Sequence, residues 1–185
     1  KNSIMKENWE LLSSETKFSN RILNIRHDWY LFNRSGTKKD YTVIDTGDWV
    51  NIIPLTRENE FILIKQYRHG TKEIEIPGGT IEKYDITPEE AARRELLEET
   101  GYTSDKFTSL GTIIPNPAIQ NNRCYIFLAE DVLKSSEQNL DPHEEIELLF
   151  TPRKKISSMI KKGEINHSLV IDAFCLLMLH EGKEI

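Results

Sequence analysis

Three glutamates, Glu95, Glu98 and Glu99, fall within five consecutive positions of a segment that is typical of a helix. At about 100° per residue, their carboxylates share an arc of about 100° on one helical face. On an exposed face, their mutual repulsion costs only roughly 0.2–0.5 kcal/mol per pair. On a partly buried face, two carboxylates about 5 Å apart repel by roughly 3 kcal/mol, which requires a cation. Hard oxygen ligands of this kind suit Mg²⁺ or Mn²⁺.

The helix that carries these glutamates has recognisable ends. Thr87 and Glu90 form a capping box, in which a threonine is followed three residues later by a glutamate. Gly101 suits the left-handed position that ends a helix. The helix is therefore predicted over residues 88–100. Within this helix, Arg94 lies four positions before Glu98, and the two side chains can pair.

The stretch from Pro77 to Tyr102 resembles the Nudix box, the signature of the Nudix hydrolases, written G-x5-E-x7-R-E-U-x-E-E-x-G-U with U aliphatic. The run Arg94–Tyr102, RELLEETGY, matches the second half of the box, with Tyr102 in the place of the last aliphatic residue. Gly79 matches the first glycine. A match of this length, preceded by a strand pattern and bracketed by helix signals, is highly specific.

The first half of the box departs from the family pattern. Six residues after Gly79 the family has glutamate, whereas this chain has Asp85. Eight residues, rather than seven, then separate Asp85 from Arg94, so one residue has been added within residues 82–87. The sequence alone does not show whether Asp85 pairs with Arg94.

The resemblance implies hydrolysis of a nucleoside diphosphate linked to another group. It implies that Glu95 and Glu99 are the main metal ligands and that Glu98 is a further or outer ligand. Two or three Mg²⁺ ions, or Mn²⁺, would neutralise the diphosphate and activate a water molecule for in-line attack on phosphorus. Arg94 belongs to the same catalytic set.

Over residues 9–181 the chain is similar to the ADP-ribose and nucleoside-diphosphate-sugar pyrophosphatases. Pro117 lies 15 residues after Tyr102, a spacing associated with the ADP-ribose enzymes. In that group a glutamate from a late loop often acts as general base, and we favour Glu144 over Glu145. ADP-ribose, cleaved to AMP and ribose 5-phosphate, is the expected substrate. GDP-mannose or another nucleotide sugar is the alternative within the class, and a nucleotide-sugar-binding protein without catalysis is the alternative outside it.

Candidate substrate-binding residues lie outside the three glutamates. Arg68 ends a strand pattern and either holds a phosphate or distal sugar through its planar fork, or pairs with Glu73 or Glu75. Trp29 either stacks on a base or packs in a core. The substrate-binding set predicted from the sequence is Arg68, Glu75, Gly79, Pro117 and Trp29.

The pattern of elements predicts a mixed α/β class. The resemblance implies a Nudix-type α/β/α sandwich around a mixed sheet over residues 49–185, with an N-terminal antiparallel β extension over residues 1–48. Residues 131–143 are predicted to form a loop, and Thr151 and Pro152 to begin a helix that Gly163 ends. A last helix is predicted over residues 168–180. The predicted strands of the sandwich are residues 49–55, 61–68, 73–76, 107–114, 123–129 and 146–150.

Composition limits the classes of partner. The 185 residues carry a net charge of −6 without a long Lys/Arg run, which disfavours a nucleic-acid partner. No apolar run approaches the roughly 20 residues of a membrane span. Cys124 and Cys175 both lie in apolar runs and are expected to be buried free thiols, which favours a cytoplasmic protein. Similarity to dimeric relatives implies a homodimer in which the N-terminal strands contact the partner subunit and the base pocket.

Overall fold

The computed structural model describes residues 8–183, and the chain divides into two units. One unit runs as far as Gly47 and also contains residues 114–122. The other comprises residues 48–113 and the chain from Arg123 onward. The domain boundary predicted after residue 48 stays a prediction, because these units are defined by internal contacts rather than by independent folding.

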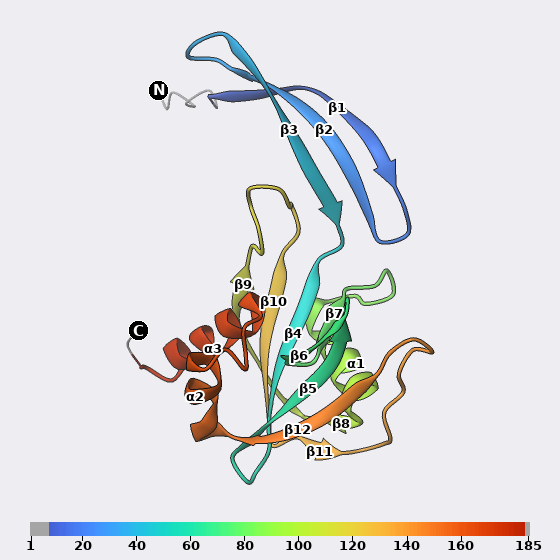
Figure 1. The fold of residues 1–185 in the computed structure, drawn as a ribbon, viewed down its shortest axis with the longest axis vertical. Coiled ribbons are helices and arrows are strands. Elements are labelled where there is room, and N and C mark those ends of the chain that lie inside the picture. The colour runs from blue at the N-terminus through green and yellow to red at the C-terminus, as the bar shows by residue number, and fades with distance from the viewer. Residues whose placement is uncertain (1–7, 184–185) are drawn as a thin grey trace. The chain divides into compact units, whose positions relative to one another are not determined.

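The N-terminal unit is a three-stranded antiparallel sheet, in the order β1-β2-β3. Its strands, blue at the start of the chain in Figure 1, are β1 (Trp9–Ser19), β2 (Leu23–Phe32) and β3 (Thr37–Thr46). This confirms the predicted β extension. Residues 114–122 join the same unit because the Ile44 N–H donates to the Ile119 carbonyl oxygen at 2.7 Å.

The second unit is built on a mixed seven-stranded sheet. Its main order is β12-β5-β4-β10-β9, while β6 pairs with β5 and β7 pairs with β4. The pairing of β10 with β4 is parallel, and the other pairings are antiparallel. The strands are β4 (Trp49–Leu55), β5 (Glu60–Arg68), β6 (Thr71–Glu75), β7 (Gly78–Thr80), β9 (Lys106–Ile113), β10 (Cys124–Glu130) and β12 (Ile146–Pro152).

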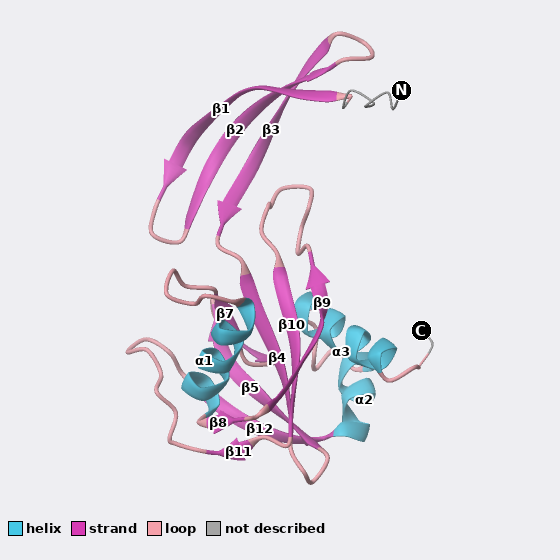
Figure 2. Cartoon of the chain, turned by 180° about the vertical axis from the view of Figure 1, so that it is seen from behind, coloured by secondary structure: helices cyan, strands magenta, loops and turns pink. Residues whose placement is uncertain are grey.

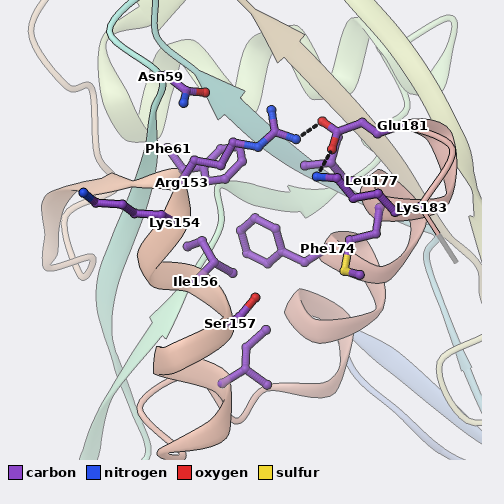
Figure 3. Close-up of a pocket in the computed structure, with 12 residues that line it drawn as sticks. Asn59, Phe61, Arg153, Lys154, Ile156, Ser157, Phe174, Leu177, Glu181 and Lys183 are labelled. Atoms are coloured by element: carbon purple, nitrogen blue, oxygen red, sulfur yellow. Dashed lines mark hydrogen bonds and ion pairs between the residues drawn. The ribbon is translucent and has the colours of Figure 1, made fainter. Parts of the chain in front are cut away.

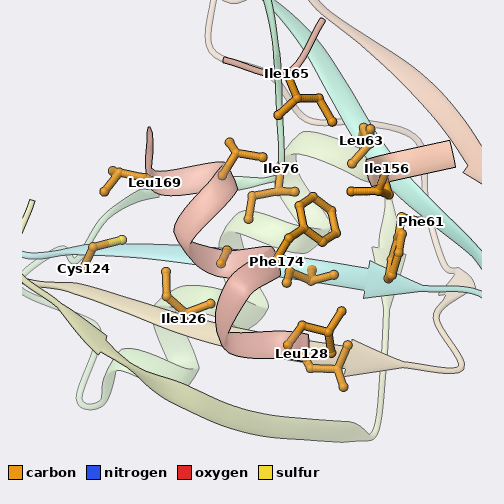
Figure 4. Packing of buried hydrophobic residues seen from close by; sticks show 14 residues of the cluster. Phe61, Leu63, Ile76, Cys124, Ile126, Leu128, Ile156, Ile165, Leu169 and Phe174 are labelled. Atoms are coloured by element: carbon orange, nitrogen blue, oxygen red, sulfur yellow. The ribbon is translucent and has the colours of Figure 1, made fainter. Parts of the chain in front are cut away.

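Helices cover both faces of this sheet (Figure 2). The helix α1 (Pro88–Thr100) lies on one face, where Leu96 packs in a cluster with Ile52. The helices α2 (Ile156–Lys161) and α3 (Ser168–His180) lie on the other face, where Phe174 packs in a cluster with Ile53 (Figure 4). Neighbouring strand residues point to opposite faces, and full burial of each such side chain stabilises the fold by about 1.5–3 kcal/mol. The α/β/α arrangement is as predicted.

The two ends of α1 are also as predicted. The Thr87 hydroxyl accepts a hydrogen bond from the Glu90 N–H at 3.2 Å, and Gly101 has φ 75°. In a capping box, the glutamate carboxylate usually accepts from the N–H of the cap residue, here Thr87, but the partner differs in this helix. The Glu90 carboxylate accepts from the N–H of Ile86, one residue before the cap, at 2.7 Å.

Two predicted elements in the second half of the chain are wrong. Thr151 and Pro152 end the strand β12 instead of beginning a helix, and a 3₁₀ turn (Arg153–Lys155) precedes α2. An edge strand tolerates a proline because its outward side needs no N–H. Residues 131–143 are not all loop either, because β11 (Leu133–Lys134) pairs with β8 (Tyr102–Thr103).

Both cysteines are free, as predicted; Cys124 is buried and Cys175 is only partly so. Within residues 8–183, no helix combines the length and the apolar character that a membrane crossing needs.

Cys124 should make the stability of the fold depend on alkaline pH. Burial raises the pKa of its thiol to about 12, whereas an unfolded thiol ionises near pH 8.5. The folded state therefore holds this proton to higher pH, and the stability it contributes is lost as the pH rises from the unfolded towards the folded pKa. Between pH 8 and pH 10, the free energy of unfolding should fall by about 2 kcal/mol more in the wild type than in Cys124→Ala. Urea titrations at both pH values measure this; parallel losses in the two proteins contradict it.

Candidate active site

The three glutamates of α1 differ in burial. Glu99 is the most enclosed, with 4% of its surface exposed, and its Oε2 accepts a hydrogen bond from the Gly78 N–H at 2.8 Å. The side chain of Glu95 is 14% exposed and that of Glu98 is 38% exposed. The face is thus partly buried, which is the condition under which clustered carboxylates call for a cation.

The two glycines before the helix let the backbone approach these carboxylates. A Cβ at Gly79 would overlap the Glu95 carboxylate, and a Cβ at Gly78 would overlap the Val50 carbonyl oxygen. Both glycines lie in β7, which pairs with β4 and is not among the strands predicted from the sequence. The sequence signal was ambiguous because glycine disfavours a strand interior except where a close approach requires it.

Arg94 connects the loop before the helix to the glutamates. Its Nε and Nη2 donate to the Asp85 carboxylate at 3.2 and 2.8 Å. Its Nη1 donates to Glu95 at 2.7 Å and to Glu98 at 3.1 Å, as the spacing of four predicted for Glu98. The pairing of Asp85 with Arg94, which the sequence left open, is therefore present.

Burial determines the electrostatics of the cluster. It raises the pKa of Glu99 well above its usual value, and hydrogen bonding to Gly78 opposes this only partly. Burial also raises the pKa of Glu95, against the lowering effect of Arg94. The pKa of Asp85 is lowered, mainly by its hydrogen bonds with Arg94. The charged forms of Glu95 and Glu99 are therefore only partly compensated by their partners in the protein itself.

The donor set fits a hard divalent cation. In the part of the chain that is described, no three His, Cys, Asp or Glu side chains converge closely enough to hold a metal ion as they stand. Arg94 instead draws Glu95 and Glu98 towards itself. However, carboxylate oxygens are the ligands that Mg²⁺ and Mn²⁺ prefer, and a cation would favour the charged forms that burial disfavours.

Arg68 and Glu75 form an ion pair in the unit that also carries the three glutamates. The Arg68 Nε and Nη2 donate to the two Glu75 oxygens at 2.9 and 3.0 Å, so Glu75 rather than Glu73 is its partner. Glu75 is buried, whereas the Arg68 side chain is 48% exposed. Hydrogen bonding to Glu75 raises the pKa of Arg68, and the charges of Glu99 and Glu144 add to this. The guanidinium therefore lies near the carboxylate cluster.

The two candidate loop acids have different surroundings. The charge of Glu144 contributes to the raised pKa of both Glu95 and Glu99, after the larger effect of burial. Glu145 instead accepts a hydrogen bond from Lys72 at 2.6 Å, which mainly accounts for its lowered pKa. Of the two loop acids, Glu144 is therefore the one whose charge affects the pKa values of the cluster, while its carboxylate accepts a hydrogen bond from the Asp141 N–H at 3.0 Å.

The structure does not bring the two remaining predicted residues together. Pro117 lines a cavity of about 380 Å³ in the N-terminal unit, with Trp9, Tyr30 and Tyr41. Trp29 points to the opposite face of β2, where its ring lies 5.7 Å from that of His27. Trp29 is 39% exposed, which contradicts the alternative that it packs in a core. Alternation along β2 places Trp29 and Tyr30 on opposite faces, but no local sequence signal indicates which of the two faces meets Pro117.

A cavity of about 430 Å³ lies in the second unit, away from the carboxylates (Figure 3). It is bounded by α2 and α3, with Phe61 and Phe174 in its wall and the ion pair of Arg153 with Glu181 at its edge. Because it opens on the face of the sheet opposite α1, it does not contribute to the candidate site.

Comparison with known proteins identifies the family of the chain. Residues 46–174 match the NUDIX domain. The ADP-ribose pyrophosphatase of Bacillus subtilis (strain 168) is 28% identical over 94% of each chain. The methanol dehydrogenase activator of Bacillus methanolicus is 28% identical over 92% of this chain and 93% of its own. The GDP-mannose pyrophosphatase of Enterobacter sp. (strain 638) is 28% identical over 78% and 80%.

A solved structure supports the fold. The crystal structure of an ADP compounds hydrolase superposes with a TM-score of 0.84 over 98% of this chain and 100% of that chain, at 22% identity. The fold, the box on α1 and the match over residues 46–174 lead to one conclusion. The chain belongs to the Nudix family and is a Nudix hydrolase.

Proposed function

We propose that the protein hydrolyses the diphosphate of a nucleotide sugar, with ADP-ribose as the leading substrate and AMP and ribose 5-phosphate as products. The observation that carries the proposal is the partly buried carboxylate face of α1, with Glu99 bonded to Gly78 and Glu95 bonded to Arg94. The relative named ADP-ribose pyrophosphatase spans 94% of each chain, which supports this substrate. A relative named GDP-mannose pyrophosphatase makes GDP-mannose the second candidate.

We infer that Glu95, Glu98 and Glu99 hold Mg²⁺ or Mn²⁺. When bound, such a cation supplies charge neutralisation for the diphosphate and lowers the pKa of a coordinated water. The contribution of the chain is the placement of the ligands. Gly78 orients the Glu99 carboxylate, and Arg94 orients the other two.

Arg68 and Glu144 complete the proposed site. Glu75 engages the Nε and Nη2 of Arg68, which fixes the guanidinium and leaves its Nη1 end to bind a phosphate oxygen or the distal sugar. The Glu144 carboxylate would accept a proton from the attacking water. At the same time the water oxygen bonds to phosphorus and the bridging P–O bond breaks. General base catalysis of this kind contributes roughly 10²–10⁴-fold.

Replacement of the two loop acids should separate their roles. Glu144→Gln should lower kcat by about 10²-fold or more, because an amide cannot accept the proton. Glu145→Gln is the matched control and should stay within about threefold of wild type, because its ion pair with Lys72 is exposed. Steady-state rates with Mg²⁺ over a range of substrate concentrations measure both. Equal losses in the two variants would remove Glu144 from the mechanism.

A panel of nucleotide sugars tests the substrate. ADP-ribose and GDP-mannose are each incubated with the protein in Mg²⁺ and in Mn²⁺, and the monophosphate products are separated and identified. Turnover of ADP-ribose with the higher kcat/KM supports the first proposal, and preference for GDP-mannose supports the second. If no diphosphate is cleaved while a nucleotide sugar binds, the protein is a binding module on a Nudix fold.

We propose further that the N-terminal extension, up to residue 48, makes a homodimer. It exposes large apolar side chains, including Leu11 and Phe18 on β1 and Ile22 in the turn after it, at 51%, 51% and 65%. Exposed apolar groups of this size are typical of an interaction surface. Sedimentation velocity should show a dimer, and Phe18→Glu should shift it towards monomer. A wild-type protein that sediments as an active monomer contradicts the proposal.

A further inference from the structure

The irregular first half of the box can be aligned in two ways. Counted six positions on from Gly79, the acid of the box falls on Asp85; counted eight positions back from Arg94, it falls on Ile86. The structure distinguishes the two, because Asp85 pairs with Arg94 whereas Ile86 is 86% exposed. The acid therefore keeps its spacing to the glycine, and the added residue lies between Asp85 and the arginine.

Asp85 performs two tasks with one short side chain. Both of its oxygens accept from Arg94, and Oδ2 also accepts from the Glu82 N–H at 2.8 Å. The Asp85 N–H donates to the Glu82 carbonyl oxygen at 3.0 Å, so the same residue closes the turn. Its side chain is only 4% exposed. A glutamate at this position would extend about 1.5 Å further and would not fit between the turn and Arg94 without displacement.

Ile86 contributes backbone rather than side chain. A large apolar residue at 86% exposure packs against little, and leaving it in water stabilises nothing. Its N–H, in contrast, is anchored by the Glu90 carboxylate at 2.7 Å. One more residue before the helix gives the chain the length to bring the residue 85 backbone nearer to Arg94.

We propose that Ile86 is a one-residue spacer matched to the short side chain of Asp85, and that Asp85 is a positioning residue for the metal ligands. Asp85 acts through Arg94, whose Nη1 holds Glu95 and Glu98. The family pattern has a longer acid and a connection that is one residue shorter at this point. The inference rests on the proposed metal site but not on the identity of the substrate.

Four proteins test the match: wild type, Asp85→Glu, a deletion of Ile86, and the two changes together, which recreate the regular spacing of the box. Mn²⁺ binding to each metal-free protein is measured by calorimetry, and thermal unfolding is followed without metal. Each single change should weaken Mn²⁺ binding by about 10-fold or more, as loss of an outer-shell partner does. The combination should return to within about threefold of wild type.

Two further variants keep the test decisive if the deletion fails to fold. Ile86→Ala retains the spacer and should bind Mn²⁺ as the wild type does. Asp85→Asn retains the shape but removes the charge, and should lose affinity as Asp85→Glu does. Affinity losses that simply add in the combined variant, or an Asp85→Glu protein with wild-type affinity, overturn the inference.

The outcomes are also separable from those of the proposed function. One outcome is that the single changes weaken Mn²⁺ binding and the combination restores it while no nucleotide sugar is hydrolysed. In that case the substrate proposal is wrong and the proposal of a matched spacer is supported. If a nucleotide sugar is hydrolysed but Asp85→Glu binds Mn²⁺ as wild type does, the spacer fails and the substrate proposal stands.

Discussion

Glu99→Gln should lower metal-dependent turnover by about 10³-fold, at the upper end of what removing one preorganised electrostatic group costs. Glu99 is the most enclosed carboxylate of the cluster, and the Gly78 N–H fixes one of its oxygens. Glutamine keeps the shape and can keep that hydrogen bond, but it loses the negative charge that attracts a divalent cation. The measurement is kcat/KM for the best nucleotide sugar at saturating Mg²⁺.

Stability provides the control for this variant. Because burial raises the pKa of Glu99 in the folded protein, the folded state binds more protons than the unfolded one between the two pKa values. The fold is therefore weakened as the pH rises through that window, and the cost is fully present above the folded pKa. Metal-free Glu99→Gln avoids this cost and should be at least as stable as wild type at pH 8. A variant that is both inactive and strongly destabilised would show that Glu99 supports the fold rather than the reaction.

Arg94→Ala should have the largest effect on stability, at about 3 kcal/mol in the metal-free protein, the lower end for breaking a buried ion pair. The side chain is 18% exposed and donates to the Asp85, Glu95 and Glu98 carboxylates and to the Thr80 carbonyl oxygen. Its removal leaves three neighbouring negative charges without their common partner. Urea unfolding at pH 8 measures the loss.

The neighbouring arginine is the matched control. Arg93 lies on the same helix and pairs with Glu89, and both side chains are more than a third exposed. It also donates to the Ser104 carbonyl oxygen at 2.6 Å and lies over the Phe107 ring, but it holds one carboxylate rather than three. Exposed pairs contribute roughly 0–1 kcal/mol, so Arg93→Ala should cost clearly less than Arg94→Ala. Arg94→Lys should fall between the two, because lysine retains the charge but not the planar fork that engages Asp85. Similar losses for both arginines would mean that the Arg94 contacts add little to the stability of the fold.

Local signals predicted α1 completely, because each of its determinants acts within a few residues. Thr87 caps the helix, Gly101 ends it, and the spacing of Arg94 and Glu98 places them in contact. The strand pattern also predicted six of the seven strands of the main sheet, all except β7. Thr151 and Pro152 were mistaken for a helix start because the same two residues suit the end of an edge strand.

Contacts between distant segments were not predictable. The Gly78 N–H reaches Glu99 across 21 positions, and no local pattern encodes that bond. The pairing of Asp85 with Arg94 depends on the path of the loop. Trp29 and Pro117 were predicted in one substrate-binding set, whereas Tyr30 rather than Trp29 lines the cavity with Pro117. Similarity to a family supplies residue types at box positions but not the accommodation of an added residue.

Mn²⁺ titration of the metal-free protein tests the central claim, that the carboxylate face of α1 binds a divalent metal, most directly. Wild type, Glu95→Gln, Glu99→Gln and the control Glu145→Gln are compared by calorimetry at pH 8. We expect Glu95→Gln and Glu99→Gln to bind Mn²⁺ at least about tenfold more weakly than wild type, and Glu145→Gln to bind it as wild type does. Unchanged affinity in Glu95→Gln and Glu99→Gln would contradict the account and place the metal elsewhere.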